Sequence, residues 1–250
     1  MLVRVIKTRA LMPPQDDLFS LFRKNFSEFS LKEKSIIVIA SKIVSIWQGR
    51  CVKIGSKLNK DDLVKKEADF YLDRSEVPKG YVMLTVKDNI LIPMAGIDES
   101  NGNGYFILWP NNPFGAAKEI YNFIKKDYCL NDLGIIIADS HCTPSRLGTT
   151  GISIAYYGFY PLRDYRGTKD IFGREMKMSQ SNVADSLAAA AVLVIGEGNE
   201  QTPIAVIEDI NSIKFQEFDP AISNPLEIDR DDDIYAPLLK AIKWQKGGGH

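Results

Sequence analysis

Residues 134–140 read "GIIIADS", an apolar run that stops at an acid and a serine. Residues 35–40, "SIIVIA", form a second apolar run that has no polar alternation. Unbroken apolar runs of about four to eight residues are typical of strands that are buried on both faces. The two runs therefore predict buried strands at the centre of the fold.

The segments around these two runs form an irregular pattern. Helices are expected at 12–26, 59–74, 112–128, 179–195 and 228–246, and strands at 3–8, 81–96 (two strands around a Lys-Asp-Asn turn), 104–109, 151–162, 172–178 and 203–208. Segment 42–54 fits a helix or a strand. Because helices and strands do not alternate cleanly, the order favours an α+β fold, an irregular mixed α/β arrangement with mixed sheets, over a doubly wound sheet.

Capping residues predict the ends of two helices. Ser179 or Ser181 is expected to cap the helix at 179–195, and Gly196 to end it. Four aspartates between positions 229 and 233 precede the closing helix, and their complementarity to the helix dipole is a better explanation than metal binding. The last residues, 247–250, are expected to form a frayed tail.

Composition limits the class of protein. The 250 residues are assigned to one domain, 1–250. The chain has 31 basic and 32 acidic residues and therefore a net charge of −1, which argues against a protein that binds nucleic acids or anionic membranes. No apolar run approaches the roughly 20 residues of a membrane span, and the N-terminus lacks a signal-peptide core. Three separated cysteines without a Cys-x-x-Cys pair suggest reduced thiols and no zinc site. We expect a cytoplasmic protein.

Three acids follow apolar segments, and they are the main candidates for chemistry. Asp98, Asp139 and Glu197 come after "ILIPMAGI", "GIIIA" and "VLVIG". One such acid is usually a turn former, but three beside serines and glycines favour a site for a hard divalent cation. Gly196 and Gly198 allow backbone N–H groups to approach phosphate oxygens closely.

Other catalytic patterns are absent from the sequence. It contains no G-x-x-x-x-G-K-[ST], G-x-G-x-x-G or G-x-S-x-G motif. His141 and Cys142 are neighbours whose side chains diverge, so a Cys–His dyad is not expected from this pair. A thiol transferase built on Cys142 is the weaker alternative, and His141 is expected to contact the backbone or substrate.

At these residues the chain resembles the coenzyme F420-0:γ-glutamyl ligases. The resemblance runs from about residue 35 to residue 210. It is carried by "SKIVSIWQGR" (41–50), "AGIDESN" (95–101), "DYRGTKDIFGRE" (164–175), "VADSLAAAA" (183–191) and "GEGNEQTP" (196–203). The order and spacing of these motifs match over most of the chain.

The resemblance implies an enzyme that uses GTP (or ATP) with Mg²⁺ or Mn²⁺ to join L-glutamate to a heteroaromatic carboxylate acceptor through an acyl phosphate. It also implies a homodimer with two intertwined lobes and a site near the subunit interface. The implied metal ligands are Asp98, Asp139, Ser140 and Glu197, and the implied catalytic residues are Asp98, Asp139 and Arg146. The implied nucleotide contacts are Leu11, Met12, Pro13, Ser41, Lys42, Asn101, Gly196, Gly198, Asn199, Glu200, Gln201 and Thr202.

The chain departs from the family pattern at positions that carry charge. Ile46 stands where the family often has a lysine, Ser140 replaces a threonine, and Cys142-Thr143 replaces Gly-Arg. Arg146 is retained. These losses leave a non-catalytic nucleotide- and metal-binding homologue as the alternative to an active ligase.

The departures also bear on the acceptor. A subgroup that shares "TPxRxGTTG" and "GEGNEQTP" is thought to glutamylate folates. A folate lacks the phosphodiester of F420-0 and needs fewer cations, so the lost charges give a slight preference for a folate. Arg163, Arg166, Lys169 or Arg174 could supply replacement charge for the positions that were lost. The aromatic residues that could stack on either acceptor are Tyr156, Tyr157, Phe159 and Tyr160.

Overall fold

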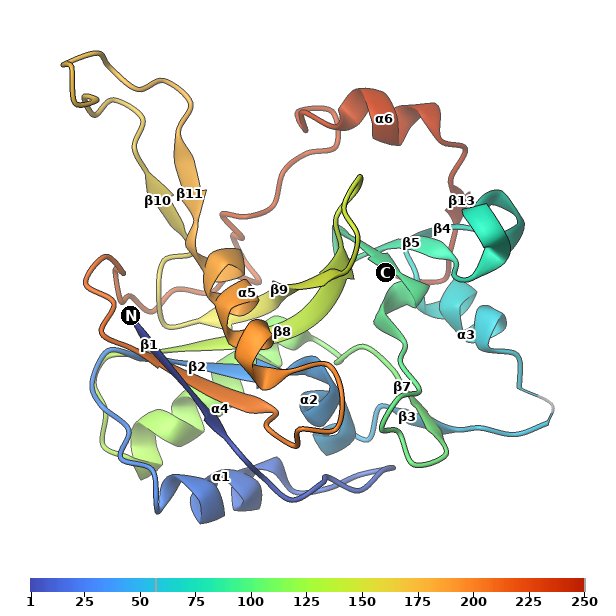
Figure 1. Ribbon diagram of the computed structural model, residues 1–250, viewed down its shortest axis with the longest axis horizontal. Coiled ribbons are helices and arrows are strands. Elements are labelled where there is room, and N and C mark those ends of the chain that lie inside the picture. The colour runs from blue at the N-terminus through green and yellow to red at the C-terminus, as the bar shows by residue number, and fades with distance from the viewer. Residues whose placement is uncertain (57, 250) are drawn as a thin grey trace.

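The centre of the molecule is a five-stranded mixed sheet that contains both apolar runs (Figure 1). The computed structural model describes residues 1–56 and 58–249. The strand order is β1 (Leu2–Ile6), β12 (Ile204–Glu208), β2 (Ser35–Ala40), β8 (Leu133–Cys142) and β9 (Thr149–Tyr157). β2 and β8 are parallel, and the other neighbours are antiparallel. The α+β expectation with mixed sheets is therefore confirmed.

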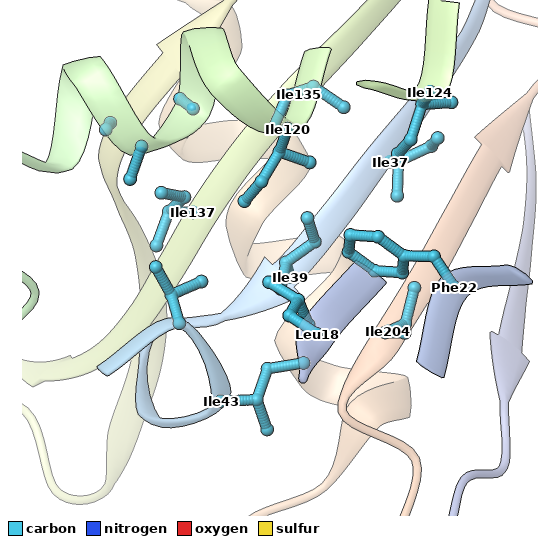
Figure 2. Packing of buried hydrophobic residues seen from close by; sticks show 14 of the residues in the cluster. Leu18, Phe22, Ile37, Ile39, Ile43, Ile120, Ile124, Ile135, Ile137 and Ile204 are labelled. Atoms are coloured by element: carbon cyan, nitrogen blue, oxygen red, sulfur yellow. The ribbon is translucent and has the colours of Figure 1, made fainter. Parts of the chain in front are cut away.

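Helices cover both faces of this sheet because its strands are apolar on both faces. α1 (Leu18–Phe26), α2 (Ser41–Trp47) and α4 (Pro113–Asp127) pack on one face, against Ile37 and Ile39 of β2 and Ile135 and Ile137 of β8 (Figure 2). α5 (Val183–Ile195) packs on the other face, against the alternate residues of the same strands. Burying one such side chain completely contributes about 1.5–3 kcal/mol, so these layers fix the position of the strand ends.

A smaller antiparallel sheet lies beside this unit. Its order is β13 (Gln245–Lys246), β4 (Phe70–Leu72), β5 (Leu84–Lys87) and β6 (Ile90–Pro93), and it has a separate apolar cluster shared with α3 (Lys60–Glu67). β3 (Cys51–Lys53) pairs with β7 (Tyr105–Ile107), and β10 (Leu162–Asp164) pairs with β11 (Gln180–Asn182) in an arm that extends away from the body (Figure 1). α6 (Ala236–Ala241) lies near the C-terminus, and three short 3-10 segments cover Arg74–Glu76, Pro78–Gly80 and Met94–Gly96.

Within residues 1–56 and 58–249, no helix is long and apolar enough to cross a membrane.

Several expected boundaries were wrong. The helix expected at 59–74 ends at Glu67, because residues 70–72 pair with β5 instead. The helix expected at 179–195 begins at Val183, since Asn182 caps it through its side chain and residues 180–182 belong to β11. Neither Ser179 nor Ser181 is the cap, whereas Gly196 does follow the last helical residue. Segment 42–54 contains both α2 and β3.

Two further segments differ for reasons of local hydrogen bonding. The strand expected at 172–178 is a turn, in which the Asp170 carboxylate accepts from two backbone N–H groups. The closing helix expected at 228–246 is reduced to α6, because aspartate carboxylates at 229 and 233 stabilise turns before it. Residues 247–249 are not frayed: Gly247 donates to Asp69 O at 2.9 Å, and a Cβ on Gly247 would lie 2.0 Å from Ala68 O. Residue 250 lies outside the described residues.

Candidate functional site

A cavity of about 680 Å³ opens where β2 and β8 end. Because these two strands are parallel, their carboxyl ends lie at the same edge of the sheet. The cavity is also bordered by the loop after β6, by the N-terminal segment 8–11 and by the loop at 196–203 after α5. Segments that are far apart in the sequence therefore contribute side chains to one site.

Asp139 projects into the cavity from within β8. It was expected at a turn, but β8 continues through Cys142, paired with β9, and a register irregularity lies just before it at Ile137/Ala138. Its Oδ2 accepts from Ser41 Oγ at 2.8 Å and its Oδ1 from the Ser140 N–H at 2.7 Å. Burial raises the pKa of this carboxyl to about 6, although both hydrogen bonds oppose the shift.

Asp98 reaches the cavity from the loop after β6 and is paired with a cation. Lys42 Nζ is 2.5 Å from Asp98 Oδ2, and Ser100 donates to both carboxylate oxygens at 2.8 Å. Burial raises the pKa of Asp98, but the hydrogen bond and charge of Lys42, together with Ser100, outweigh burial and leave this pKa below its usual value. Asp98 therefore remains ionised at neutral pH.

Glu197 comes from the end of α5. Gly196 leaves the helix with φ +83°, a conformation that favours glycine, and this turn directs the next residue to the cavity. Ser140 Oγ donates to Glu197 Oε1 at 2.6 Å, so β8 and the loop after α5 are joined by a charge-assisted hydrogen bond. Asn101 Nδ2 donates to Gly198 O at 2.8 Å and joins the same loop to the loop after β6.

The three acids share the cavity without forming a single cluster. Among residues 1–56 and 58–249, no group of three or more His, Cys, Asp or Glu side chains is placed to hold a metal ion. Asp98, Asp139 and Glu197 instead accept hydrogen bonds from Lys42, the serine hydroxyls and the backbone. The hard oxygen donors suit Mg²⁺ or Mn²⁺, provided that the ion takes one or two carboxylates and completes its shell with water and substrate oxygens.

The structure brings most of the other predicted residues to the same cavity. Those that line it are Leu11, Ser41, Lys42, Asn101, Ser140, Gly196, Gly198, Asn199, Glu200, Gln201 and Thr202, as well as His141. Met12, Pro13 and Arg146 are not part of the lining. Met12 is exposed, and Arg146 lies in the exposed turn between β8 and β9.

The four basic residues that could replace the charge lost at positions 46 and 143 do not line the cavity of the same chain. Arg163, Arg166, Lys169 and Arg174 lie on the arm, where Arg166 pairs with Asp164. Tyr156, Tyr157 and Phe159 are buried in the core, and Tyr160 contacts the core at the protein surface; none of the four lines the cavity.

Sequence reasoning missed four polar residues of the lining, Thr8, Arg9, Asn103 and Thr149. Thr8 was assigned to the first expected strand, at 3–8, which the structure ends at Ile6. Arg9 directly follows that expected strand, and its position there was a signal that could have been used. Thr149 was not recognisable, because its place in the cavity depends on the pairing of β9 with the polar half of β8.

Comparison with known proteins gives concordant matches. Residues 6–209 match the family described as F420-0:Gamma-glutamyl ligase. A coenzyme F420:L-glutamate ligase of Methanococcus maripaludis (strain C7) is 32% identical over 196 residues, which cover 73% of this chain and 79% of that protein. The corresponding protein of Methanocaldococcus jannaschii is 31% identical over 198 residues, covering 74% and 79%. That of Haloarcula marismortui is 30% identical over 246 residues, covering 91% and 92%.

Proposed function

Since the chain belongs to the F420-0:γ-glutamyl ligase family, we propose that it uses a nucleoside triphosphate and a divalent cation to join L-glutamate to a carboxylate acceptor. The names of the three relatives support L-glutamate as one substrate and coenzyme F420 as the other, and the family description supports F420-0 as the acceptor. The observation that carries the proposal is the arrival of Asp98, Asp139 and Glu197 in one cavity from three separate elements.

The reaction that suits this cavity has two displacements. A carboxylate oxygen of the acceptor attacks the γ-phosphorus of the nucleotide, which releases the nucleoside diphosphate and leaves an acyl phosphate. The amino group of L-glutamate then attacks the acyl carbon, phosphate leaves, and the amine loses a proton to give the amide. Phosphoryl transfer of this kind needs positioning and charge neutralisation more than a protein nucleophile.

The residues of the cavity divide these tasks. Asp98, Asp139, Ser140 and Glu197 would hold Mg²⁺ or Mn²⁺, and a bound cation supplies neutralisation of the phosphate charge. In the loop at 196–203, the N–H groups of Gly196 and Gly198 already donate to Val192 O and Glu200 Oε2, so residues 199–202 would supply the backbone donors to the nucleotide phosphates. Asn101 holds that loop through Gly198 O. The apolar wall that includes Ile46 and Ile97 suits the flat ring of a base or acceptor.

For the acceptor, the support favours F420-0 over a folate. The slight preference for a folate depended on lost charge at positions 46 and 143. Thr143 lies outside the cavity lining, so of these two positions Ile46 is the one that lines the cavity. None of the three relatives named above is a folate enzyme by name. Offering both acceptors at equal concentration and comparing their rates of mass gain will test this choice, and faster glutamylation of the folate would reverse it.

We extend the proposal to a homodimer. Ile171 and Phe172 at the tip of the arm are 92% and 89% exposed, and Met178 on the same arm is 85% exposed. Apolar side chains in this number on a projecting arm are suited to burial against a second copy. Light scattering of the purified protein should give the mass of two chains, and a monomer at micromolar concentration would refute this part.

The test of the proposed function is the coupled release of nucleoside diphosphate and phosphate. We expect release only when L-glutamate, F420-0, a divalent cation and either GTP or ATP are present together, and omission of each component identifies its role. Parallel assays with each nucleotide, and with Mg²⁺ or Mn²⁺, define the preferences. A protein that binds nucleotide with no release under any combination would be the non-catalytic homologue.

A further inference from the structure

The charge balance of the cavity raises the question of which cation meets an incoming anion. Four carboxylates line the cavity, from Asp98, Asp139, Glu197 and Glu200. In the described part of the chain, the lysine and arginine side chains of the lining are Lys42 and Arg9. A phosphate group that leaves water needs charged donors that are not already engaged by the protein.

Lys42 has no donor left for such a group. An ammonium group carries three N–H donors. Lys42 Nζ lies 2.5 Å from Asp98 Oδ2, 2.9 Å from Ser100 O and 3.1 Å from Ser100 Oγ. All three donors therefore have protein partners.

Two N–H donors of Arg9 have no acceptor among the described residues. Its guanidinium group carries five N–H donors, of which three have partners: Nη1 donates to Ala10 O at 3.0 Å and to Asp16 Oδ2 at 2.6 Å, and Nη2 donates to Asp16 Oδ1 at 2.7 Å. Among the described residues, no group accepts from Nε or from the second Nη2 hydrogen. These two donors lie next to each other on one edge of the planar group, in the arrangement that binds two oxygens of a phosphate.

Asp16 holds Arg9 in a fixed position. The Asp16 carboxylate also accepts from the backbone N–H groups of Met12, at 2.8 Å, and Asp17, at 2.7 Å. The hydrogen bond from Arg9 keeps the pKa of Asp16 well below its usual range, so this partner stays ionised.

The N-terminal segment that carries Arg9 is held in place by contacts with the loop at 196–203 and with α2. Thr8 N–H donates to Gln201 O at 2.8 Å, which joins the segment to the loop at 196–203. Leu11 is buried in the same cluster as Ile43 and Ile46 of α2, and Gln15 Nε2 donates to Trp47 O at 3.2 Å. Arg9 therefore lies between the proposed nucleotide loop and α2.

We propose that Arg9 binds a phosphate group of a substrate in this cavity, and that Asp16 is the residue that positions Arg9 for it. This inference rests on the proposed function, because it takes a phosphate-bearing substrate as the ligand. Two such groups are available in the reaction: the phosphate chain of the nucleotide and the phosphodiester of F420-0. Arg9 thereby supplies a cation on the N-terminal segment, while position 46 of the α2 wall is apolar.

The experiment compares three variants of the full chain. Arg9→Met removes the charge and donors but keeps an unbranched side chain, and Arg9→Lys keeps the charge without the paired donors. Arg23→Met is the matched control, because Arg23 is also a partly exposed arginine paired with an aspartate, Asp127, but lies outside the cavity lining. Titration calorimetry measures the dissociation constants of GTP and guanosine with Mg²⁺, and of F420-0 and a folate.

We expect Arg9→Met to weaken the binding of one phosphate-bearing ligand by about 10- to 100-fold, the range for a hydrogen bond to a charged group. If that ligand is GTP, guanosine binding should not change; if it is F420-0, folate binding should not change. Arg9→Lys should lose part of the affinity, and Arg23→Met none. An Arg9→Met protein that binds GTP and F420-0 within twofold of the wild type would overturn this inference alone. A wild type that binds neither ligand would overturn it together with the proposed function.

Discussion

The two halves of β8 differ in what surrounds them, although they form one continuous strand. Residues 133–138 are buried, with Ile135, Ile136 and Ile137 at 0% exposure and Ala138 at 2%. Residues 139–142 are partly or fully exposed, and all four line the cavity. The first half is packed between helix layers on both faces, and the second half carries polar side chains.

The cause of this difference is the length of the neighbouring strand. Ala40 is the last residue of β2, and it pairs with Ala138. The chain then turns into α2 at Ser41, so beyond Ala138 the strand β8 keeps only β9 as a neighbour. The resulting opening admits Asp139 and Ser140, and Ser41 at the start of α2 donates to Asp139. Residues 133–138 of β8 therefore stabilise the core, and the next residues of the same strand, 139–142, line the cavity.

Shortening a side chain in the buried half should have the largest effect on stability. Ile137→Ala leaves a cavity in a closely packed core, and we expect a loss of about 2–5 kcal/mol in the free energy of unfolding. Turnover per folded molecule should stay within about twofold of the wild type. Urea unfolding and an assay of the folded fraction measure the two quantities. A fall in turnover that exceeds the loss of folded protein would show that the halves are not separable.

The reverse result is expected in the polar half. Asp139→Asn keeps the shape but removes the charge proposed to hold the cation, and we expect turnover to fall by at least about 100-fold, or about 2.7 kcal/mol in transition-state stabilisation. Unfolding in EDTA should not be destabilised. Full activity at saturating Mg²⁺ or Mn²⁺ would remove Asp139 from the site. Combining Asp139→Asn with Glu197→Gln should not add to the loss if the acids act as one unit.

Asp139 also predicts a pH effect that the buried half lacks. Its pKa is about 6 in the folded protein against 3.8 for the ordinary group, so the folded state holds a proton that the unfolded state has released. In metal-free protein, stability from this group is therefore greatest below pH 4 and is lost as pH rises from 4 through 6, by about 3 kcal/mol. Urea unfolding between pH 4 and 8 should show this slope in the wild type but not in Asp139→Asn. Equal slopes would contradict it.

The smallest effect is expected at the last residue of the strand. Cys142 is exposed, and the proposed reaction has no covalent enzyme intermediate. Cys142→Ser should leave turnover within about twofold of the wild type. If the substitution, or alkylation of Cys142, abolished turnover while nucleotide binding remained, a thiol-transfer mechanism would replace the acyl phosphate.

The sequence predicted the buried half of β8 better than the polar half. The run at 134–138 identifies a buried strand, because apolar residues have few alternatives to burial. Its continuation through Asp139–Cys142 depends on pairing with residues 149–152, and polar residues carry no periodic signal for that pairing. The same limit explains why residues 70–72 were assigned to a helix: their strand exists through pairing with β5.

For the site, the sequence predicted which acids meet but not how they are engaged. Each acid follows an apolar segment, and that pattern identified the three acids that line one cavity. The ammonium of Lys42 on Asp98 and the hydroxyl of Ser140 on Glu197 arise from contacts between distant segments. Arg9 was missed although it directly follows the first expected strand, and its pairing with Asp16, seven residues away, was not foreseen.

The central claim is that this cavity glutamylates F420-0, and the mass of the acceptor tests it most directly. Purified protein is incubated with F420-0, L-glutamate, Mg²⁺ or Mn²⁺, and GTP or ATP, beside an identical reaction with Asp139→Asn. We expect the wild type to increase the mass of F420-0 by at least one glutamyl residue, only when nucleotide and cation are present, and the variant to give almost none. An unchanged acceptor mass in every wild-type reaction, or an equal gain with the variant, would contradict the account.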